Sequence, residues 1–241
     1  MGLTRWFITG LAVVLAIGLA GCNPIQLRQQ SAQVPTLVLS SLSDPKTFNP
    51  VLSQEVNEVF GLVSEGLISE NGVTGKIEPA LAQSWEFSTD QKSIIFTMRQ
   101  NLKWSDGQPL TVDDVVFTYN DIYLNEKIPS DTRDVLRIGK EGKLPRVEKL
   151  DDRRVQFSIP EPFAPFLRIT GIGILPEHIL KPAVTTLDSE GKPQFFSTWG
   201  VDTNPANIVV PGPYKIESYA TSQRVILRRN PYYWRKDAQG N

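Results

Sequence analysis

Few residues in this 241-residue chain have the types and spacing that catalysis or metal binding requires. His178 is the only histidine, and no second metal ligand or nucleophile lies near it in the sequence pattern. A role as ligand or base is the alternative, but we interpret His178 as a helix-start residue after Pro176. Asp113-Asp114 and Asp151-Asp152 are adjacent pairs whose side chains diverge on a helix or a strand, so neither pair forms an acid/base couple. The sequence also has no Gly-x-Ser-x-Gly motif, so we expect no enzyme activity, no metal site and no cofactor.

Phosphate and nucleic-acid binding are disfavoured by both motif and charge. Residues 72–76 contain Gly-x-x-Gly-Lys, but they lack the full spacing and the trailing Ser or Thr of a phosphate-binding loop. They follow Glu70-Asn71, as the residues of a hairpin turn do. The chain carries 25 basic and 26 acidic side chains, whereas a surface that binds nucleic acid needs clustered positive charge. We therefore predict a hairpin turn here and no nucleic-acid partner.

The only cysteine, Cys22, lies where a covalent modification is expected. Arg5 precedes an apolar run over residues 6–19, which is shorter than the ~20 residues that span a bilayer. The run leads into Leu-Ala-Gly-Cys, which is similar to the lipobox of bacterial lipoproteins, whose cysteine is lipidated on its thiol and becomes the first residue. A buried or free thiol is the alternative. We predict a signal peptide over residues 1–21, lipidation of Cys22 and a flexible tether over residues 22–35.

The elements that would position a site are clearest in the middle of the chain. Apolar and polar side chains alternate over residues 93–99, which predicts a half-buried strand. Residues 105–107, Ser-Asp-Gly, predict a turn. Thr111 and Asp114 predict a capping box at the start of a helix over residues 112–123, because their spacing suits the free amides of a first helical turn.

Elsewhere the sequence predicts further elements of an α/β fold. We expect a strand over residues 36–40, an amphipathic helix over residues 54–67 and a half-buried strand over residues 155–159. The mixed charges of residues 131–154 predict a solvated excursion from the fold. Prolines stiffen an apolar crossover over residues 163–167.

Aromatic residues mark the joins between these elements. Residues 79–85 predict a short apolar turn that docks a tryptophan. Trp85 and Trp104 flank the strand over residues 93–99, so we expect both side chains in the core. Residues 232–234, Tyr-Tyr-Trp, end a strand and would either stack on a ligand or form a buried aromatic corner.

Short motifs without chemistry of their own follow one another in a distinctive order. They are Glu65-Gly66-Leu67, Pro79–Trp85, Phe96–Arg99, Lys103–Gly107 and Asp113-Asp114-Val115. A second group is Gly212-Pro213-Tyr214 and Arg229-Asn230-Pro231, followed by Tyr233-Trp234. Together they resemble the bacterial extracellular solute-binding proteins of family 5, which serve peptide, nickel and related ABC importers. Val210-Pro211 replaces the Gly-x that is usual in the family.

The resemblance implies a periplasmic-binding-protein-like type II fold of the α/β class, with mixed α and β elements. Within a family portion over residues 36–241, it implies a first lobe built from residues 36–64 and 171–241. Residues 65–170 would form a subdomain inserted into that lobe. Family members continue into a second lobe, which we expect to be absent from this chain.

The resemblance also implies a function. It implies a substrate-binding lipoprotein of an ABC importer that captures an extracellular solute, most often an oligopeptide or dipeptide, and delivers it to a membrane permease. Such a protein would be held in the cell envelope by its lipid anchor, on the periplasmic or extracellular face. Position in the family's cleft-lining loop gives Leu52, Ser53 and Gln54 as candidate substrate-binding residues, although they match no fixed motif. The alternatives are a sensor lipoprotein that reuses the fold and, from another class, an envelope hydrolase.

Overall fold

The computed structural model describes residues 38–41, 43–55 and 58–236. The predicted signal peptide, Cys22 and the predicted tether lie outside the described residues. Of the strand expected over residues 36–40, residues 38–40 are described and form no strand, so the prediction is wrong there. No helix within the described ranges is long and apolar enough to cross a membrane.

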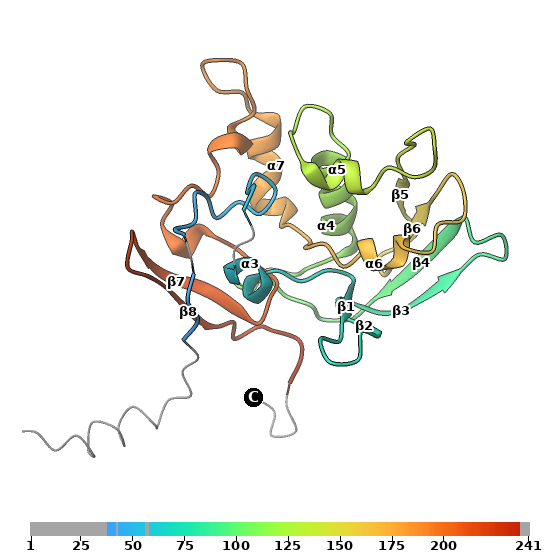
Figure 1. The fold of residues 1–241 in the computed structure, drawn as a ribbon, viewed down its shortest axis with the longest axis horizontal. Coiled ribbons are helices and arrows are strands. Elements are labelled where there is room, and N and C mark those ends of the chain that lie inside the picture. Colours follow the sequence, from blue (N-terminus) through green and yellow to red (C-terminus); the bar gives the residue numbers. More distant parts are fainter. Residues whose placement is uncertain (1–37, 42, 56–57, 237–241) are drawn as a thin grey trace, which may run out of the picture. The chain divides into compact units, whose positions relative to one another are not determined.

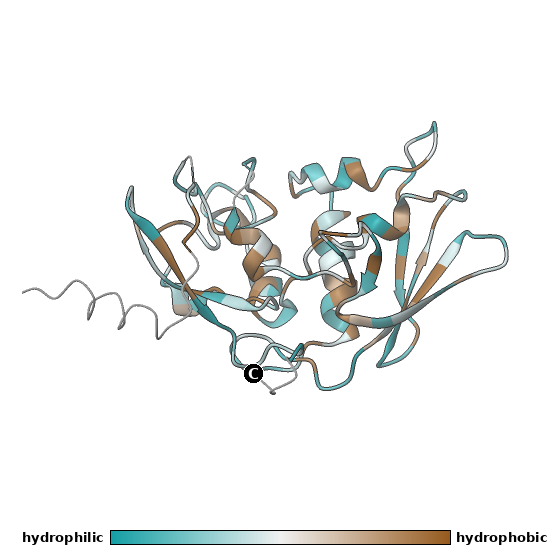
Figure 2. Ribbon diagram, turned by 60° about the horizontal axis from the view of Figure 1, so that its bottom comes forward, coloured by the Kyte–Doolittle hydropathy of each residue, from teal (hydrophilic) through white to brown (hydrophobic). Residues whose placement is uncertain are grey.

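A four-stranded antiparallel sheet organises the middle of the chain (Figure 1). In spatial order its strands are β3 (Ala82–Phe87), β4 (Ser93–Met98), β6 (Arg154–Ser158) and β5 (Arg146–Lys149). Burial alternates along β4 and β6, as their sequences predict. The strands in Figure 2 carry bands of both hydrophobic and hydrophilic residues. The buried face is joined by aromatic packing, since the rings of Phe96 and Phe157 meet edge to face with centroids 5.5 Å apart.

Helix α4 (Val112–Phe117) packs against β5 and β6. Its first turn confirms the predicted capping box: the Thr111 hydroxyl accepts a hydrogen bond from the Asp113 amide at 3.2 Å, and the Asp114 carboxylate accepts one from the Thr111 amide at 2.8 Å. The chain continues as a π-helical segment (Thr118–Tyr123). The two segments together occupy the span that the sequence predicts as one helix.

The Gly-x-x-Gly-Lys segment is a hairpin turn. It connects strands β1 (Ile68–Glu70) and β2 (Ile77–Pro79), which pair antiparallel. The Asn71 side-chain oxygen accepts hydrogen bonds from the amides of Val73 and Thr74, both at 3.0 Å, and Gly75 adopts a φ of +67° that favours glycine. These contacts confirm the predicted turn.

The other elements connect or flank these two sheets. They are α3 (Glu58–Val63), α5 (Asp131–Val135), α6 (Phe166–Ile169), α7 (Glu177–Thr185), the 3₁₀ segments Gln194–Ser197 and Pro205–Asn207, β7 (Tyr214–Ala220) and β8 (Arg224–Arg229). Strands β7 and β8 form an antiparallel hairpin with a bulge between Ile216 and Ser218. Helix α3 packs against β7.

Two motif glycines lie where segments cross closely. A Cβ atom at Gly66 would lie 2.3 Å from the carbonyl oxygen of Gly171, and one at Gly212 would lie 2.4 Å from the carbonyl carbon of Val63. The Gly212 amide also donates a hydrogen bond to the Val63 carbonyl at 2.9 Å. Neither position can hold a larger residue without moving the backbone, which explains the glycines physically.

Besides the strand expected over residues 36–40, predictions for three further stretches differ from the structure. Residues 82–87 form edge strand β3 rather than a turn, and Trp85 on that strand is half-buried, whereas Trp104 is fully buried as predicted. Within the helix expected over residues 54–67, residues 54–55 are not helical, residues 56–57 are not described and α3 spans residues 58–63. It ends there because the chain passes close to Gly171 at Gly66 and then pairs in β1.

The third difference concerns residues 131–154, which are not a solvated excursion. They contain α5 and β5, and they bury the side chains of Leu136, Ile138 and Val147. Most charged residues of this stretch are exposed and the others are half-buried, and mixed surface charge is compatible with regular structure.

Candidate functional site

The candidate substrate-binding residues lie on one tight turn before α3. The amides of Leu52 and Ser53 both donate hydrogen bonds to the Asn49 carbonyl, at 3.2 and 3.1 Å. Leu52 and Ser53 are half-buried and Gln54 is exposed. The turn therefore groups an apolar side chain, a hydroxyl and an exposed amide within three successive residues.

The turn belongs to a loop over residues 44–55, here called the candidate loop. This loop is attached to the fold at several points besides the turn itself. The Asp44 carboxylate accepts hydrogen bonds from the amide and the hydroxyl of Ser222, at 2.6 and 3.1 Å, in the β7–β8 turn. The rings of Phe48 and Tyr219 meet edge to face with centroids 5.4 Å apart. The Lys46 ammonium pairs with the Glu55 carboxylate at 2.7 Å. The loop is thus fixed to the β7–β8 hairpin at its beginning and to itself at its end.

The aromatic residues after β8 form a corner around the carboxylate of half-buried Glu65. Glu65 accepts hydrogen bonds from the Tyr233 hydroxyl at 3.2 Å and from the Trp234 indole at 3.1 Å. Burial raises the pKa of Glu65, and these two hydrogen bonds oppose that shift. The Arg99 guanidinium lies 3.9 Å from the centre of the Trp234 ring and donates to the Ala80 carbonyl. Of the two alternatives, the contacts of Tyr233 and Trp234 favour the aromatic corner, although both residues are half-buried rather than buried.

Tyr232 differs from its two neighbours. Its side chain is 42% exposed, and its ring covers Gly107, where a Cβ atom would lie 3.1 Å away. The Lys103 ammonium lies 5.5 Å from the ring centre. Tyr232 thus packs on the 103–107 turn while keeping part of its ring accessible.

His178 is the second residue of α7, as the sequence predicts, but it has a partner that sequence reasoning missed. Its Nε2 lies 2.8 Å from the Asp106 carboxylate, 72 residues earlier in the chain. The pair lies beside a groove of about 820 Å³ between the start of α4 and α7, lined by Thr111, Asp114, His178 and Lys181 among others. The contact fastens the 105–107 turn to α7. Within the described ranges, no group of three or more His, Cys, Asp or Glu side chains is placed to hold a metal ion.

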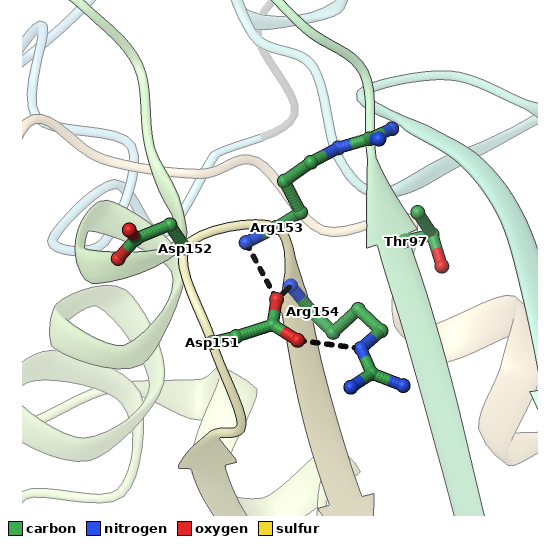
Figure 3. Close-up of a pocket in the computed structure, with 5 residues that line it drawn as sticks. All are labelled: Thr97, Asp151, Asp152, Arg153 and Arg154. Carbon is green, nitrogen blue, oxygen red and sulfur yellow. Dashed lines mark hydrogen bonds and ion pairs between the residues drawn. The ribbon is translucent and has the colours of Figure 1, made fainter.

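A second hollow, of about 390 Å³, is lined by Thr97 and residues 151–154 at the β5–β6 turn (Figure 3). Its carboxylate is already engaged, since Asp151 accepts hydrogen bonds from the amides of Arg153 and Arg154 and from the Arg154 side chain, at 2.6 to 2.9 Å. Asp152 instead pairs with Lys149 at 3.1 Å. The two adjacent carboxylates diverge as predicted, and so do Asp113, which is exposed, and Asp114, which is buried.

The mixed α/β fold is that of the type II periplasmic binding proteins. The periplasmic binding protein MelB of Agrobacterium fabrum C58, solved in complex with stachyose, superposes with a TM-score of 0.70 over 82% of this chain and 31% of its own, at 26% identity. The chain belongs to the bacterial extracellular solute-binding proteins, family 5, because the profile of the family's middle part matches residues 76–240. This confirms the resemblance that the ordered motifs indicate.

Curated relatives agree with that assignment. A probable ABC transporter-binding protein of Deinococcus radiodurans is 33% identical over 205 residues, covering 83% of this chain and 34% of the relative. The periplasmic oligopeptide-binding protein OppA of Salmonella typhimurium is 28% identical over 237 residues, covering 93% of this chain and 41% of the relative. The chain therefore spans between a third and a half of the length of these relatives.

Proposed function

We propose that this chain forms one wall of the solute-binding cleft in the substrate-binding lipoprotein of an ABC importer, with peptides as the solute class. The observation that carries the proposal is that 93% of the chain aligns, at 28% identity, with a periplasmic oligopeptide-binding protein. In this proposal, residues 36–64 and 171–241 form the first lobe, and residues 65–170 form a subdomain inserted into it. The lipid on Cys22 holds the protein at the cell envelope, where it meets the permease.

The turn that carries Leu52, Ser53 and Gln54 is the proposed ligand-facing surface. The exposed Gln54 amide offers both a donor and an acceptor, which suits the backbone of an extended peptide. Half-buried Leu52 offers apolar surface beside it. A second lobe would supply the opposite wall, and a ligand that contacts both walls would favour the closed form by its differential affinity.

The requirement for two walls gives the proposal its first test. A peptide docked on one wall stays half solvated, and net gains of ~1 kcal/mol per hydrogen bond do not offset the cost of association. Calorimetry with a mixed library of di- to pentapeptides should therefore detect weak or no binding to this chain and clear binding to a version extended by a second lobe. Micromolar or tighter binding by this chain alone would contradict the two-wall argument.

A pair of variants of the extended protein localises the ligand. Gln54→Ala should weaken peptide binding about tenfold if the amide contributes a typical hydrogen bond. Gln108→Ala is the matched control, because Gln108 is also an exposed glutamine and lines the α4–α7 groove, away from the 52–54 turn. Equal affinities for both variants would remove the 52–54 turn from the ligand site.

A further inference from the structure

Asn49 is a buried residue on which the candidate loop converges. Asn49 as a whole is 1% exposed. Its side-chain amide donates to the carbonyls of Phe195 and Thr198, both at 3.4 Å, and its side-chain oxygen accepts from the Val51 amide at 3.1 Å. The backbone carbonyl of Asn49 accepts hydrogen bonds from the amides of Leu52 and Ser53. One asparagine thus shapes the turn and ties it to the segment over residues 195–199.

Trp199, at the end of that segment, has an unusual backbone. Its φ of +61° lies in the left-handed region, where a bulky residue is a genuine outlier. The other non-glycine residues with positive φ among the described ranges are Gln91, Asn101 and Ser222, which occupy polar turns after or between strands. Trp199 is instead 3% exposed, with its indole donating to the Asn207 carbonyl at 3.0 Å. A buried, strained tryptophan persists only where its surroundings enforce the conformation.

The backbone carbonyl of Trp199 faces the candidate loop. The Trp199 carbonyl accepts the Phe48 amide at 2.8 Å and the Thr47 hydroxyl at 3.1 Å. The same hydroxyl accepts the Asn49 amide at 3.0 Å. The two sets of contacts therefore act on successive residues: Thr47 and Phe48 are held by Trp199, and Asn49 is held by Phe195 and Thr198.

We propose that Asn49 and Trp199 are positioning residues for the proposed ligand-facing turn. They do not face the ligand themselves, since both are buried. They fix the backbone of residues 51–54 before any ligand arrives, so that binding does not have to order the turn. This inference rests on the proposed function for its biological meaning, but the positioning itself is measurable without a ligand.

The chain contains a structural twin of Asn49 that serves as a control. Asn230 is 5% exposed and is also followed by proline. Its side-chain oxygen accepts the amide two residues later, from Tyr232, at 3.0 Å, and its side-chain amide donates to the Gly212 carbonyl at 2.9 Å. The same substitution at either asparagine removes the same kind of donor from the same kind of turn.

Asn49→Asp keeps the oxygen that accepts Val51 but removes the donor to Phe195 and Thr198, because a carboxylate only accepts. Amide hydrogen exchange, resolved by NMR on the purified protein, should show the Leu52 and Ser53 amides exchanging about tenfold faster, since local opening sets the rate. Asn230→Asp should lower the melting temperature comparably and leave those two amides unchanged. Unchanged exchange in Asn49→Asp, or equal acceleration in both variants, would overturn the proposal.

A milder variant covers the case in which Asn49→Asp does not fold. Thr47→Val keeps the shape of the side chain and removes the hydroxyl that links Trp199 to Asn49. It should accelerate exchange at Leu52 and Ser53 in the same direction, by a smaller factor. Wild-type exchange in this variant would show that the network does not hold the turn.

A peptide titration separates this inference from the proposed function. Adding the mixed di- to pentapeptide library to the version extended by a second lobe, with the wild-type residues at both asparagines, should shift the NMR signals of residues 52–54. The midpoint of that shift should move to higher peptide concentration in Asn49→Asp and not in Asn230→Asp. If the library shifts none of these signals in the extended wild type, the peptide site fails, while the exchange rates still decide whether Asn49 positions the turn.

Discussion

The carboxylate of Asp114 accepts a hydrogen bond from the backbone amide of Glu177, 63 residues further along the chain, at 2.9 Å. Its other oxygen accepts the Thr111 amide at 2.8 Å. One carboxylate therefore satisfies free amides at the starts of both α4 and α7 and joins the two helices. Burial raises the pKa of Asp114, and the two backbone hydrogen bonds oppose that shift.

Asp114→Ala should accordingly be among the costliest single changes outside the hydrophobic core. It leaves two amides without their acceptor and should lower the free energy of unfolding by about 3 kcal/mol. Asp113→Ala is the neighbouring control, because Asp113 is exposed and its carboxylate pairs with Lys149 on the surface, and it should cost about 0.5 kcal/mol. Urea unfolding of both variants measures the difference. Equal losses would show that the link between the helices contributes little.

The two tryptophans of the sequence prediction should behave differently from each other. Trp104 is fully buried, so Trp104→Ala should cost about 3–5 kcal/mol of stability. Trp85 is half-buried on edge strand β3, so Trp85→Ala should cost about 2 kcal/mol or less. Phe87→Ala, a change of a 50% exposed side chain on the same strand, sets the baseline. A variant of Trp104 that melts normally yet loses peptide binding would make that side chain part of the ligand site instead.

The elements that sequence reasoning predicts correctly are set by neighbours along the chain. The alternation in β4, the turn at Asn71 and the capping box at Thr111 each depend on residues within a few positions. The wrong predictions concern elements that are set by residues distant in the chain. Residues 79–85 have the composition of a turn, but pairing with β4 draws residues 82–87 into a strand.

The candidate site shows the same division. The Asn-Pro pair at residue 49 marks a loop in the sequence, and the family's cleft-lining position points to residues 52–54. The contacts that fix this loop join residues about 150 positions apart, as between Asn49 and Thr198, and no local pattern reports them. The pairing of His178 with Asp106 was missed for the same reason. Motif order identifies the family, whereas the partners of its side chains come only from the fold.

Glu65 should make stability depend on pH in a defined direction. Its pKa is raised above the ordinary value of 4.5 by burial, so the folded state binds its proton more tightly than the unfolded state. The contribution of Glu65 to stability is therefore fully present below pH 4.5 and is lost as the pH rises through the raised value. As the pH rises from 4.5 to 8, the free energy of unfolding of the wild type should therefore fall relative to that of Glu65→Gln.

Glutamine suits this comparison because its oxygen can accept the Trp234 indole and its amide can donate to the Tyr233 hydroxyl oxygen. Glu86→Gln, an exposed change on β3, is the control and should track the wild type across the same range. A constant difference between the wild type and Glu65→Gln would show that Glu65 keeps the same protonation equilibrium in the folded and unfolded states.

Lipidation at Cys22 gives the last prediction, and it concerns residues outside the described structure. The Leu-Ala-Gly-Cys sequence that follows the apolar run motivates it. Each buried methylene of an acyl chain contributes ~0.8 kcal/mol to membrane binding, so several chains should carry the wild-type protein into the detergent phase of a partitioning assay. Cys22→Ser removes the thiol that accepts the lipid, so the variant should remain an uncleaved precursor and partition differently from the wild type. Gly21→Ala keeps the cysteine and a small residue before it, and should behave as the wild type does. Wild-type protein in the aqueous phase would contradict the anchor.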